Sequence, residues 1–219
     1  MTDARRTLSW LLLALVAVVT AGGAFLGVYY SPSQPVTSLK LAAKSTGAAT
    51  SYTEELKQTS TTTGTGQLHL VLQAPDRAIG FQQATGQRLY FVVINNTVYQ
   101  TKPTKITNSV TVHHFTVEHA VNPIPQVDPL PSYLNLVNQA KAVHRNGPVY
   151  SFSLATSTGG KAQLHYTVTG DYVSKIVVGI AGSITTIDVT KINSSPPISV
   201  PAKSLIVSGT TTTPTTTAP

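Results

Sequence analysis

The sequence predicts an α+β fold, in which one transmembrane helix precedes a large curved antiparallel β-sheet with a few helices covering its concave face. Three observations predict it. An uncharged apolar run fills residues 8–30. From residue 51 onward, apolar and polar residues alternate as they do in half-buried strands, and short turn signals separate the strands. A sheet of about ten such strands tends to curl or to close on itself.

The run at residues 8–30 is long enough to cross a bilayer. As a helix that rises about 1.5 Å per residue it is about 34 Å long, and the hydrocarbon core is about 30 Å thick. Arg5 and Arg6 precede it, and positive residues mark the cytoplasmic side. We therefore expect residues 1–7 in the cytoplasm, a single-pass signal-anchor at 8–30 in the cell membrane, and the rest of the chain on the extracytoplasmic side.

A cleaved secretory signal is the alternative interpretation of this run. Gly22 and Ala24 could form the small-residue pair of a cleavage site before Phe25. The apolar core of a signal peptide is about 7–15 residues long, whereas here the run continues to Tyr29 and Tyr30, which suit the outer membrane interface. The length of the run favours an uncleaved anchor.

The remainder of the chain divides into a linker at residues 31–36, one domain at 37–207 and a Thr/Pro-rich tail at 208–219 that we expect to be disordered. The domain is long enough for one sizeable core. The chain has no cysteine, so no disulfide supports this core. The net charge of +7 is spread over single basic residues. Nucleic-acid binding usually shows a clustered basic patch, so this charge favours a mild attraction to anionic lipid headgroups or wall polymers instead.

Turn residues and periodicity set the expected order of elements in the domain. Residues 31–35 form a stiff spacer with two prolines, and residues 36–49 form a short helix that ends at Gly47. Residues 89–94 are apolar on both faces, so their strand is expected at the centre of the sheet, covered on both sides. The other expected elements are strands from residue 51 and at 68–73, 77–81, 98–99 and 109–117, an amphipathic helix at 133–143 that Asp128-Pro129 begins, and strands at 149–155, 162–169, 173–180, 183–190 and near Ile198 and Val200.

No arrangement of residues points to an enzyme or to a cofactor. His113, His114 and His119 cluster in the sequence, but a metal site needs three or four convergent ligands, so we interpret them as polar histidines on a solvent-facing strand edge. The chain has no Gly-x-Ser-x-Gly elbow and no cysteine nucleophile. Glu54 and Asp128, like the other acids, have no partner at a readable spacing, and Asp128 is interpreted as a helix N-cap.

The apolar residues themselves are the remaining candidates for function. A curved sheet lined by them could enclose a cavity of the size of a lipid, or it could form an ordinary filled core with the helices. The sequence leaves both interpretations open. The candidate cavity residues are Leu68, Leu70, Leu72, Phe81, Tyr90, Val92, Phe115, Leu136, Val137, Phe152, Leu164 and Tyr166.

Several short motifs follow one another along the domain. They are SYT at residues 51–53, the turn APDR at 74–77, the hairpin VVINNTVY at 92–99, VDPL at 127–130 before a helix, GDYVSKI at 170–176, TIDV at 186–189 and PPISVP at 196–201. Taken together they resemble the LolA-like family of bacterial lipoprotein and lipid carriers, especially its actinobacterial LprG/LppX branch. The resemblance covers most of residues 37–203.

The resemblance implies a half-barrel of antiparallel strands whose concave apolar face, lidded by helices, holds acyl chains. The expected partners are then a lipid, a glycolipid or an acylated protein, together with the membrane that the N-terminal helix enters. Members of the branch usually carry a lipidated cysteine near the N-terminus, and this chain has an apolar run in its place. An anchored protein suits local hand-off or presentation better than long-range carriage. The alternative is a non-catalytic interaction or sensor domain of the same fold with a filled core.

Overall fold

The structure is a computed structural model that describes residues 34–62, 64–106, 112–157 and 159–207. The expected transmembrane segment at residues 8–30 and the tail at 208–219 lie outside these residues. Among the helices that the structure describes, none combines the length and the apolar character needed to cross a membrane.

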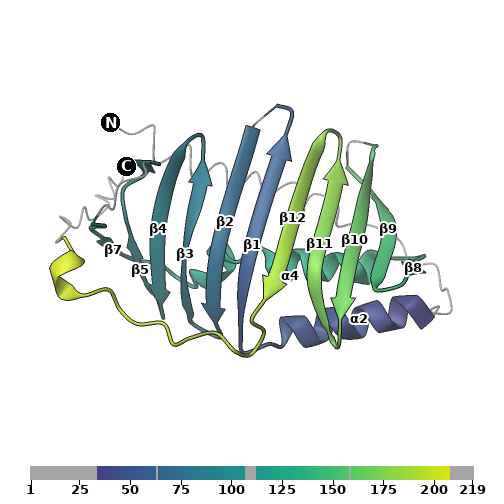
Figure 1. The fold of residues 1–219 in the computed structure, drawn as a ribbon, viewed down its shortest axis with the longest axis horizontal. Helices are drawn as coiled ribbons and strands as arrows, with labels where there is room; N and C mark the ends of the chain where they lie inside the picture. The colour runs from purple at the N-terminus through teal and green to yellow at the C-terminus, as the bar shows by residue number, and fades with distance from the viewer. Residues whose placement is uncertain (1–33, 63, 107–111, 158, 208–219) are drawn as a thin grey trace, which may run out of the picture.

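The described residues form one large antiparallel sheet of twelve strands (Figure 1). Its strands follow one another in the order β7-β5-β4-β3-β2-β1-β12-β11-β10-β9-β8, and β6 pairs with β4. The strands are β1 (Ser51–Ser60), β2 (Gly64–Gln73), β3 (Arg77–Ala84), β4 (Gln87–Ile94), β5 (Thr97–Gln100), β6 (Thr104–Lys105), β7 (Thr116–His119), β8 (His144–Asn146), β9 (Val149–Ala155), β10 (Lys161–Thr169), β11 (Tyr172–Ile180) and β12 (Ser183–Thr190).

The sheet consists of two halves that meet at one strand pair. Strands β1 to β5 form a meander of sequential hairpins, and β9 to β12 form a second one. The halves join where β1 pairs with β12 in a register that runs from Thr53↔Thr190 to Ser60↔Ser183. This long-range pairing makes a single continuous sheet out of two locally formed units.

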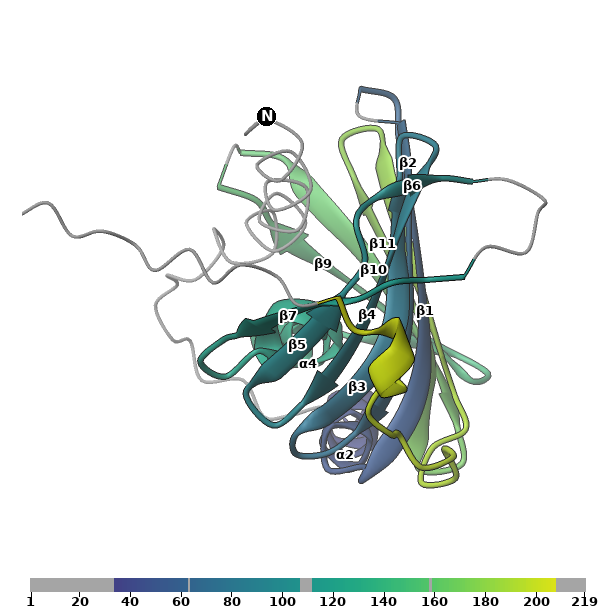
Figure 2. The same ribbon diagram turned by 90° about the vertical axis from the view of Figure 1, so that its left-hand side faces the viewer.

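The described helical elements are α2 (Gln34–Gly47), α3 (Ile124–Val127), α4 (Leu130–Asn135) and the 3₁₀ turns η1 (Leu136–Gln139) and η2 (Lys203–Leu205). Helices α2 and α4 lie on the same side of the sheet. Both views place α2 and α4 behind the lower part of the sheet as Figure 1 shows it (Figures 1 and 2). We call this side the helix-covered face and the opposite side the outer face. Buried side chains of α2, α4 and η1 form one hydrophobic core with the helix-covered face.

The expected helices are present with different limits. Helix α2 begins at Gln34, so Pro35 lies in its first turn rather than in a spacer, a position where proline's missing N–H costs nothing. The expected helix at 133–143 is also shorter. It ends at Gln139, because Ala140 is extended, and His144–Asn146 pairs with β9 instead.

Several strand expectations also change. Strand β4 is third from one edge of the sheet and not central, although Phe91, Val92 and Val93 are all buried, so both of its faces are covered. The expected strand at 109–117 appears as β7 from Thr116 to His119, and residues 109–111 lie outside the described residues. No regular strand forms near Ile198 in the described C-terminal part.

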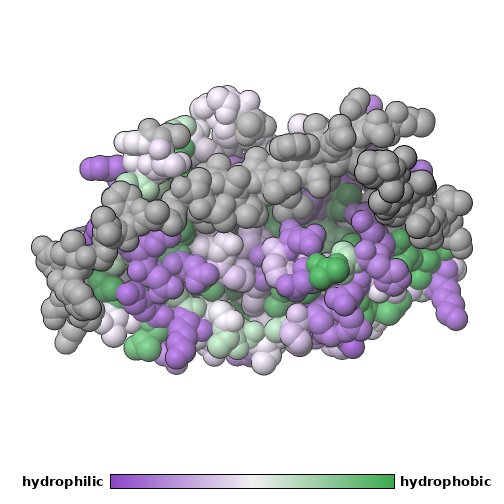
Figure 3. Space-filling view, turned by 180° about the vertical axis from the view of Figure 1, so that it is seen from behind, coloured by the Kyte–Doolittle hydropathy of each residue, from purple (hydrophilic) through white to green (hydrophobic). Residues whose placement is uncertain are grey.

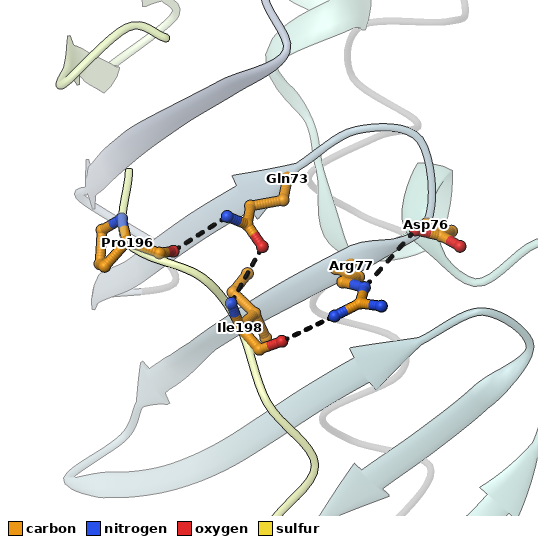
Figure 4. A network of polar contacts seen from close by, with 5 residues as sticks. All are labelled: Gln73, Asp76, Arg77, Pro196 and Ile198. Atoms are coloured by element: carbon orange, nitrogen blue, oxygen red, sulfur yellow. Dashed lines mark hydrogen bonds and ion pairs between the residues drawn. The ribbon is translucent and has the colours of Figure 1, made fainter. Parts of the chain in front are cut away.

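Residues 191–207 instead form an irregular segment, here called the C-terminal strap, that runs along the lower end of β1 to β4 (Figure 1). Gln73 holds it with its whole side-chain amide, because Nε2 donates to the Pro196 carbonyl at 3.0 Å and Oε1 accepts from the Ile198 N–H at 2.9 Å (Figure 4). Arg77 donates to the Ile198 carbonyl at 3.0 Å. The strap then forms a parallel bridge between Ile206 and Phe115.

Gly80 marks the closest approach of two strands. It pairs with Leu70 on β2 and Phe91 on β4, and a Cβ at this position would lie 2.0 Å from the His69 carbonyl oxygen. No heavy atom has room at that distance, so the bend between β2 and β3 requires glycine here.

We predict that Gly80→Ala lowers the free energy of unfolding by about 2–3 kcal/mol, because the backbone must move to admit the methyl group. The matched control is Gly179→Ala on β11, where a Cβ would meet nothing within 4 Å; it should change the stability by less than about 1 kcal/mol. Chemical denaturation of both variants measures the difference. Equal stabilities for the two variants would contradict the tight approach.

Candidate ligand-binding face

Alternate residues of the central strands point toward the helices. On β2 these are Leu68, Leu70 and Leu72, and all three are buried. The pairing of β10 with its neighbours sets Leu164 opposite Phe152 and Tyr166 opposite Tyr150, so the same face continues through the second half of the sheet. The residues between these positions are polar or half-exposed, as the period of two requires.

Buried polar contacts fix the helices on this face. The Tyr166 hydroxyl donates to the Tyr133 carbonyl of α4 at 2.6 Å. The Thr46 hydroxyl of α2 accepts from the Val173 N–H of β11 at 2.8 Å and donates to the Ala42 carbonyl at 2.8 Å. Each contact satisfies a polar group that burial would otherwise leave unpaired. These hydrogen bonds therefore fix the orientation of α2 and α4 on the sheet, in addition to the burial of their apolar side chains.

The apolar surface extends beyond the helices. Near α2 and α4, side chains such as Leu70 and Ile187 are fully buried. Leu89 near the start of β4, Leu154 near the end of β9 and Ile180 at the end of β11 lie on the same face and are only partly buried, although they pack against the core. The helix-covered face thus combines fully buried side chains with apolar side chains on β4, β9 and β11 that stay partly exposed.

The candidate cavity residues divide between the two faces. On the helix-covered face or in the helices that pack on it are Leu68, Leu70, Leu72, Leu136, Val137, Phe152, Leu164 and Tyr166. The other four lie elsewhere: Phe81, Tyr90 and Val92 on the outer face, and Phe115 against the C-terminal strap.

The hairpin register explains this correction. Gln73 pairs with Arg77, so Leu70 pairs with Gly80, and Phe81 shares the opposite face with His69. Phe91 and Val93 therefore take the positions on β4 that the sequence reasoning gave to Tyr90 and Val92. The sequence does contain a signal for this assignment. If Gln73 and Arg77 are paired across the 74–77 turn, counting residues away from the turn on both strands shows which residues of β3 and β4 share the face of Leu70.

The outer-face residues form a cluster of their own. The Phe81 ring stacks on His69 at 5.5 Å between centroids, and the Arg88 guanidinium lies 4.2 Å from the Phe81 centroid. His113 packs on Tyr90 with centroids 4.0 Å apart. These rings cover one another. Within the described ranges no three His, Cys, Asp or Glu side chains gather in a way that could hold a metal ion.

Two carboxyl groups meet beneath the helices, at the middle of the apolar face. Glu54 on β1 is 0% exposed and Asp128, which precedes α4, is 6% exposed. The Tyr52 hydroxyl donates to Asp128 Oδ2 at 2.5 Å, and the Leu130 N–H donates to Asp128 Oδ1 at 3.1 Å. Neither carboxyl oxygen of Glu54 has a hydrogen-bond partner among the described residues. The sequence analysis missed this pair. It expected Asp128 to be the N-cap of the helix, whereas Pro129 holds that position and Asp128, one residue earlier, accepts from the Leu130 N–H.

Burial opposes the ionisation of both carboxyl groups. Burial raises the pKa of Glu54 well above its usual value, and the nearby Asp128 charge raises it further. Burial also raises the pKa of Asp128, while the hydrogen bonds from Tyr52 and Leu130 oppose that rise. Because Asp128 accepts hydrogen bonds from Tyr52 and Leu130, these bonds favour its charged form over that of Glu54. Burial and the Asp128 charge likewise keep Tyr52 protonated by raising its pKa, and burial raises the pKa of Tyr133 to about 12.

The pair has a structural rather than a catalytic geometry. A general acid must reach the proton acceptor of its substrate, and Glu54 has no exposed surface. The Tyr52–Asp128 hydrogen bond instead joins β1 to the start of α4.

Comparisons with known proteins give low similarity. No protein-family model and no curated protein sequence matches the chain. Among solved structures, LprF from Mycobacterium bovis is similar with a TM-score of 0.47 and 13% identity over 79% of this chain and 99% of that one. The lipoprotein LppX from Mycobacterium tuberculosis has a TM-score of 0.42 and 10% identity over 77% and 100% of the two chains. A LolA superfamily protein from Nitrosomonas europaea has a TM-score of 0.29 and 10% identity over 73% and 92%. Likeness at these TM-scores defines neither a fold nor a function.

We predict that Glu54→Gln raises the stability of the protein at neutral pH. A raised native pKa means that the folded state binds more protons than the unfolded state, so the stability falls as the pH rises above the unfolded value of about 4.5, by up to about 1.4 kcal/mol per pH unit. Glutamine keeps a donor and cannot ionise, so this slope should flatten. Thermal unfolding followed by circular dichroism from pH 4 to 8 measures it.

The matched control is Glu55→Gln, the next residue, which lies on the outer face with its side chain 51% exposed. Its slope should equal that of the unsubstituted protein. If the Glu54→Gln variant keeps the original dependence of stability on pH, the raised pKa of Glu54 is contradicted.

Proposed function

We propose that this chain is a membrane-anchored, extracytoplasmic binding protein. It holds the acyl chain of a lipid, a glycolipid or an acylated protein against the helix-covered face, for transfer or presentation in the cell envelope. The observation that carries the proposal is the apolar region that continues beyond the helices at Leu89, Leu154 and Ile180. Burial of an acyl chain there would contribute about 0.8 kcal/mol per CH₂ group.

Two features of the sequence support the proposal. The uncharged run at residues 8–30, preceded by Arg5 and Arg6, has the length and charge asymmetry of a signal-anchor. The ordered motifs resemble those of the LolA-like family of lipid carriers, in its LprG/LppX branch, whose half-barrels hold acyl chains on a concave face. We assign no enzyme activity, because the convergent carboxyl pair among the described residues, Glu54 and Asp128, is buried beneath the helices.

The test is native mass spectrometry, with lipid extraction, of the full chain purified from the membrane fraction of its own host. The proposal expects a defined lipid or acylated peptide at near one-to-one stoichiometry. A bare protein that remains bare after exposure to host lipids would contradict it, and would favour the alternative of a filled-core interaction or sensor domain.

Point variants locate the bound ligand. We predict that Leu154→Gln, on the helix-covered face, weakens retention by about tenfold, because about 1.4 kcal/mol of apolar contact is lost. Ile184→Gln is the matched control, since Ile184 is an apolar residue 56% exposed on the outer face of β12. Equal ligand occupancy in both variants would place the ligand elsewhere, including at the anchor. Circular dichroism of each variant checks that the sheet is intact.

A further inference from the structure

We propose that the solvent-facing side of α2, formed by Thr37, Lys40, Leu41 and Lys44, lies on the anionic headgroups of the membrane that holds the chain. The inference rests on the proposed membrane anchor and adds to it the orientation of the domain. It names a phospholipid surface as the partner of a helix face that the rest of the domain leaves uncovered.

The two sides of α2 differ in what they contact. Leu39, Ala42 and Ala43 are buried in the core. The opposite side exposes Lys40 and Lys44, which are one helical turn apart, and Leu41, which is 61% exposed. The helix contains no acidic residue, and among the described residues neither lysine belongs to an ion pair. Figure 3, seen from the side of the helices, shows mainly hydrophilic side chains over α2 with a small apolar area among them.

The length of chain between α2 and the apolar run limits where this side can lie. The run ends at Tyr30 and α2 begins at Gln34, so only Ser31, Pro32 and Ser33 separate them. Even a fully extended chain covers at most about 3.6 Å per residue, so the start of α2 stays within about 14 Å of the end of the run. A helix rises about 1.5 Å per residue, which places Lys40 and Leu41 only about 10 Å further along the axis.

The chemistry of this side suits the interface. Lysine ammonium groups near a membrane surface are attracted to anionic headgroups. An exposed leucine between two lysines can enter the boundary between headgroups and acyl chains while the lysines remain at the level of the phosphates. Charge and apolar contact therefore act on the same side of one helix.

This contact would join the membrane to the candidate ligand-binding face. Helix α2 packs against α4, η1, β10 and β11 with the side opposite to Leu41. The helix that touches the headgroups is then also one of the helices that cover the apolar face.

The absence of cysteine from the chain allows a direct test with single-cysteine variants. Leu41→Cys is labelled with an environment-sensitive fluorophore in the full chain, reconstituted into vesicles of phosphatidylcholine with phosphatidylglycerol. Ile184→Cys is the matched control, because Ile184 has a similar exposure of 56% on the outer face. The label at position 41 should shift its emission to shorter wavelength and be quenched by headgroup spin-labelled lipid, whereas the label at 184 should behave as in water.

Charge reversal separates the lysine contact from mere proximity. Adding Lys40→Glu and Lys44→Glu to the Leu41→Cys chain should abolish the shift, and vesicles of phosphatidylcholine alone should give the same loss. A shift that survives both changes overturns the contact with anionic headgroups. A label at position 41 that matches the control in anionic vesicles also overturns it.

Flotation of the same vesicles distinguishes this inference from the proposed anchor. If the chain floats with the vesicles while the label at position 41 reports water, the anchor stands and the contact of α2 is wrong. If the chain does not float with the vesicles, the anchor itself is wrong. If it floats and the label shifts only in anionic vesicles, both are supported.

Discussion

The pairing of β1 with β12 is the constraint on which the rest of the molecule depends. Each half of the sheet can form from sequential hairpins, but a continuous apolar face exists only when residues 53–60 meet residues 183–190. Strand β1 also carries Tyr52 and Glu54, which face α4. A slip of one residue in this pairing would turn these side chains to the outer face and would also remove the attachment of α4.

The buried carboxyl pair places a polar feature where apolar packing would be the more stable choice. Its arrangement limits the cost, since Asp128 accepts two hydrogen bonds and burial raises the pKa of Glu54, which favours its neutral form. The gain is orientation: the Tyr52–Asp128 hydrogen bond has no equivalent at neighbouring registers of β1. Together with the Tyr166–Tyr133 contact it gives α4, a helix too short to be stable alone, a defined position over the sheet.

Local patterns predicted most of the strands, because alternation and turn residues act over a few positions. They could not assign faces across hairpins, and Phe81, Tyr90 and Val92 were placed on the wrong side, since a strand's own alternation does not say which half faces the core. Local patterns also could not predict the contact between Tyr52 and Asp128, because the two residues are 76 positions apart in the sequence. The membrane anchor stays a prediction from the sequence.

The C-terminal strap is held through its backbone between Pro196 and Ile198, whereas Asn193 near its start is bound through its side chain by Thr50. Gln73 contacts the Pro196 carbonyl and the Ile198 N–H, and Arg77 contacts the Ile198 carbonyl, so none of these bonds reads a side chain of the strap. Only Ile198 in this stretch is also buried. A new side chain within residues 196–198 therefore leaves these three bonds in place as long as the backbone keeps its path, whereas substitution of Gln73 or Arg77 removes them. The sequence requirement for this part of the strap therefore lies in the residues that bind it, Gln73 and Arg77, and not in its own side chains.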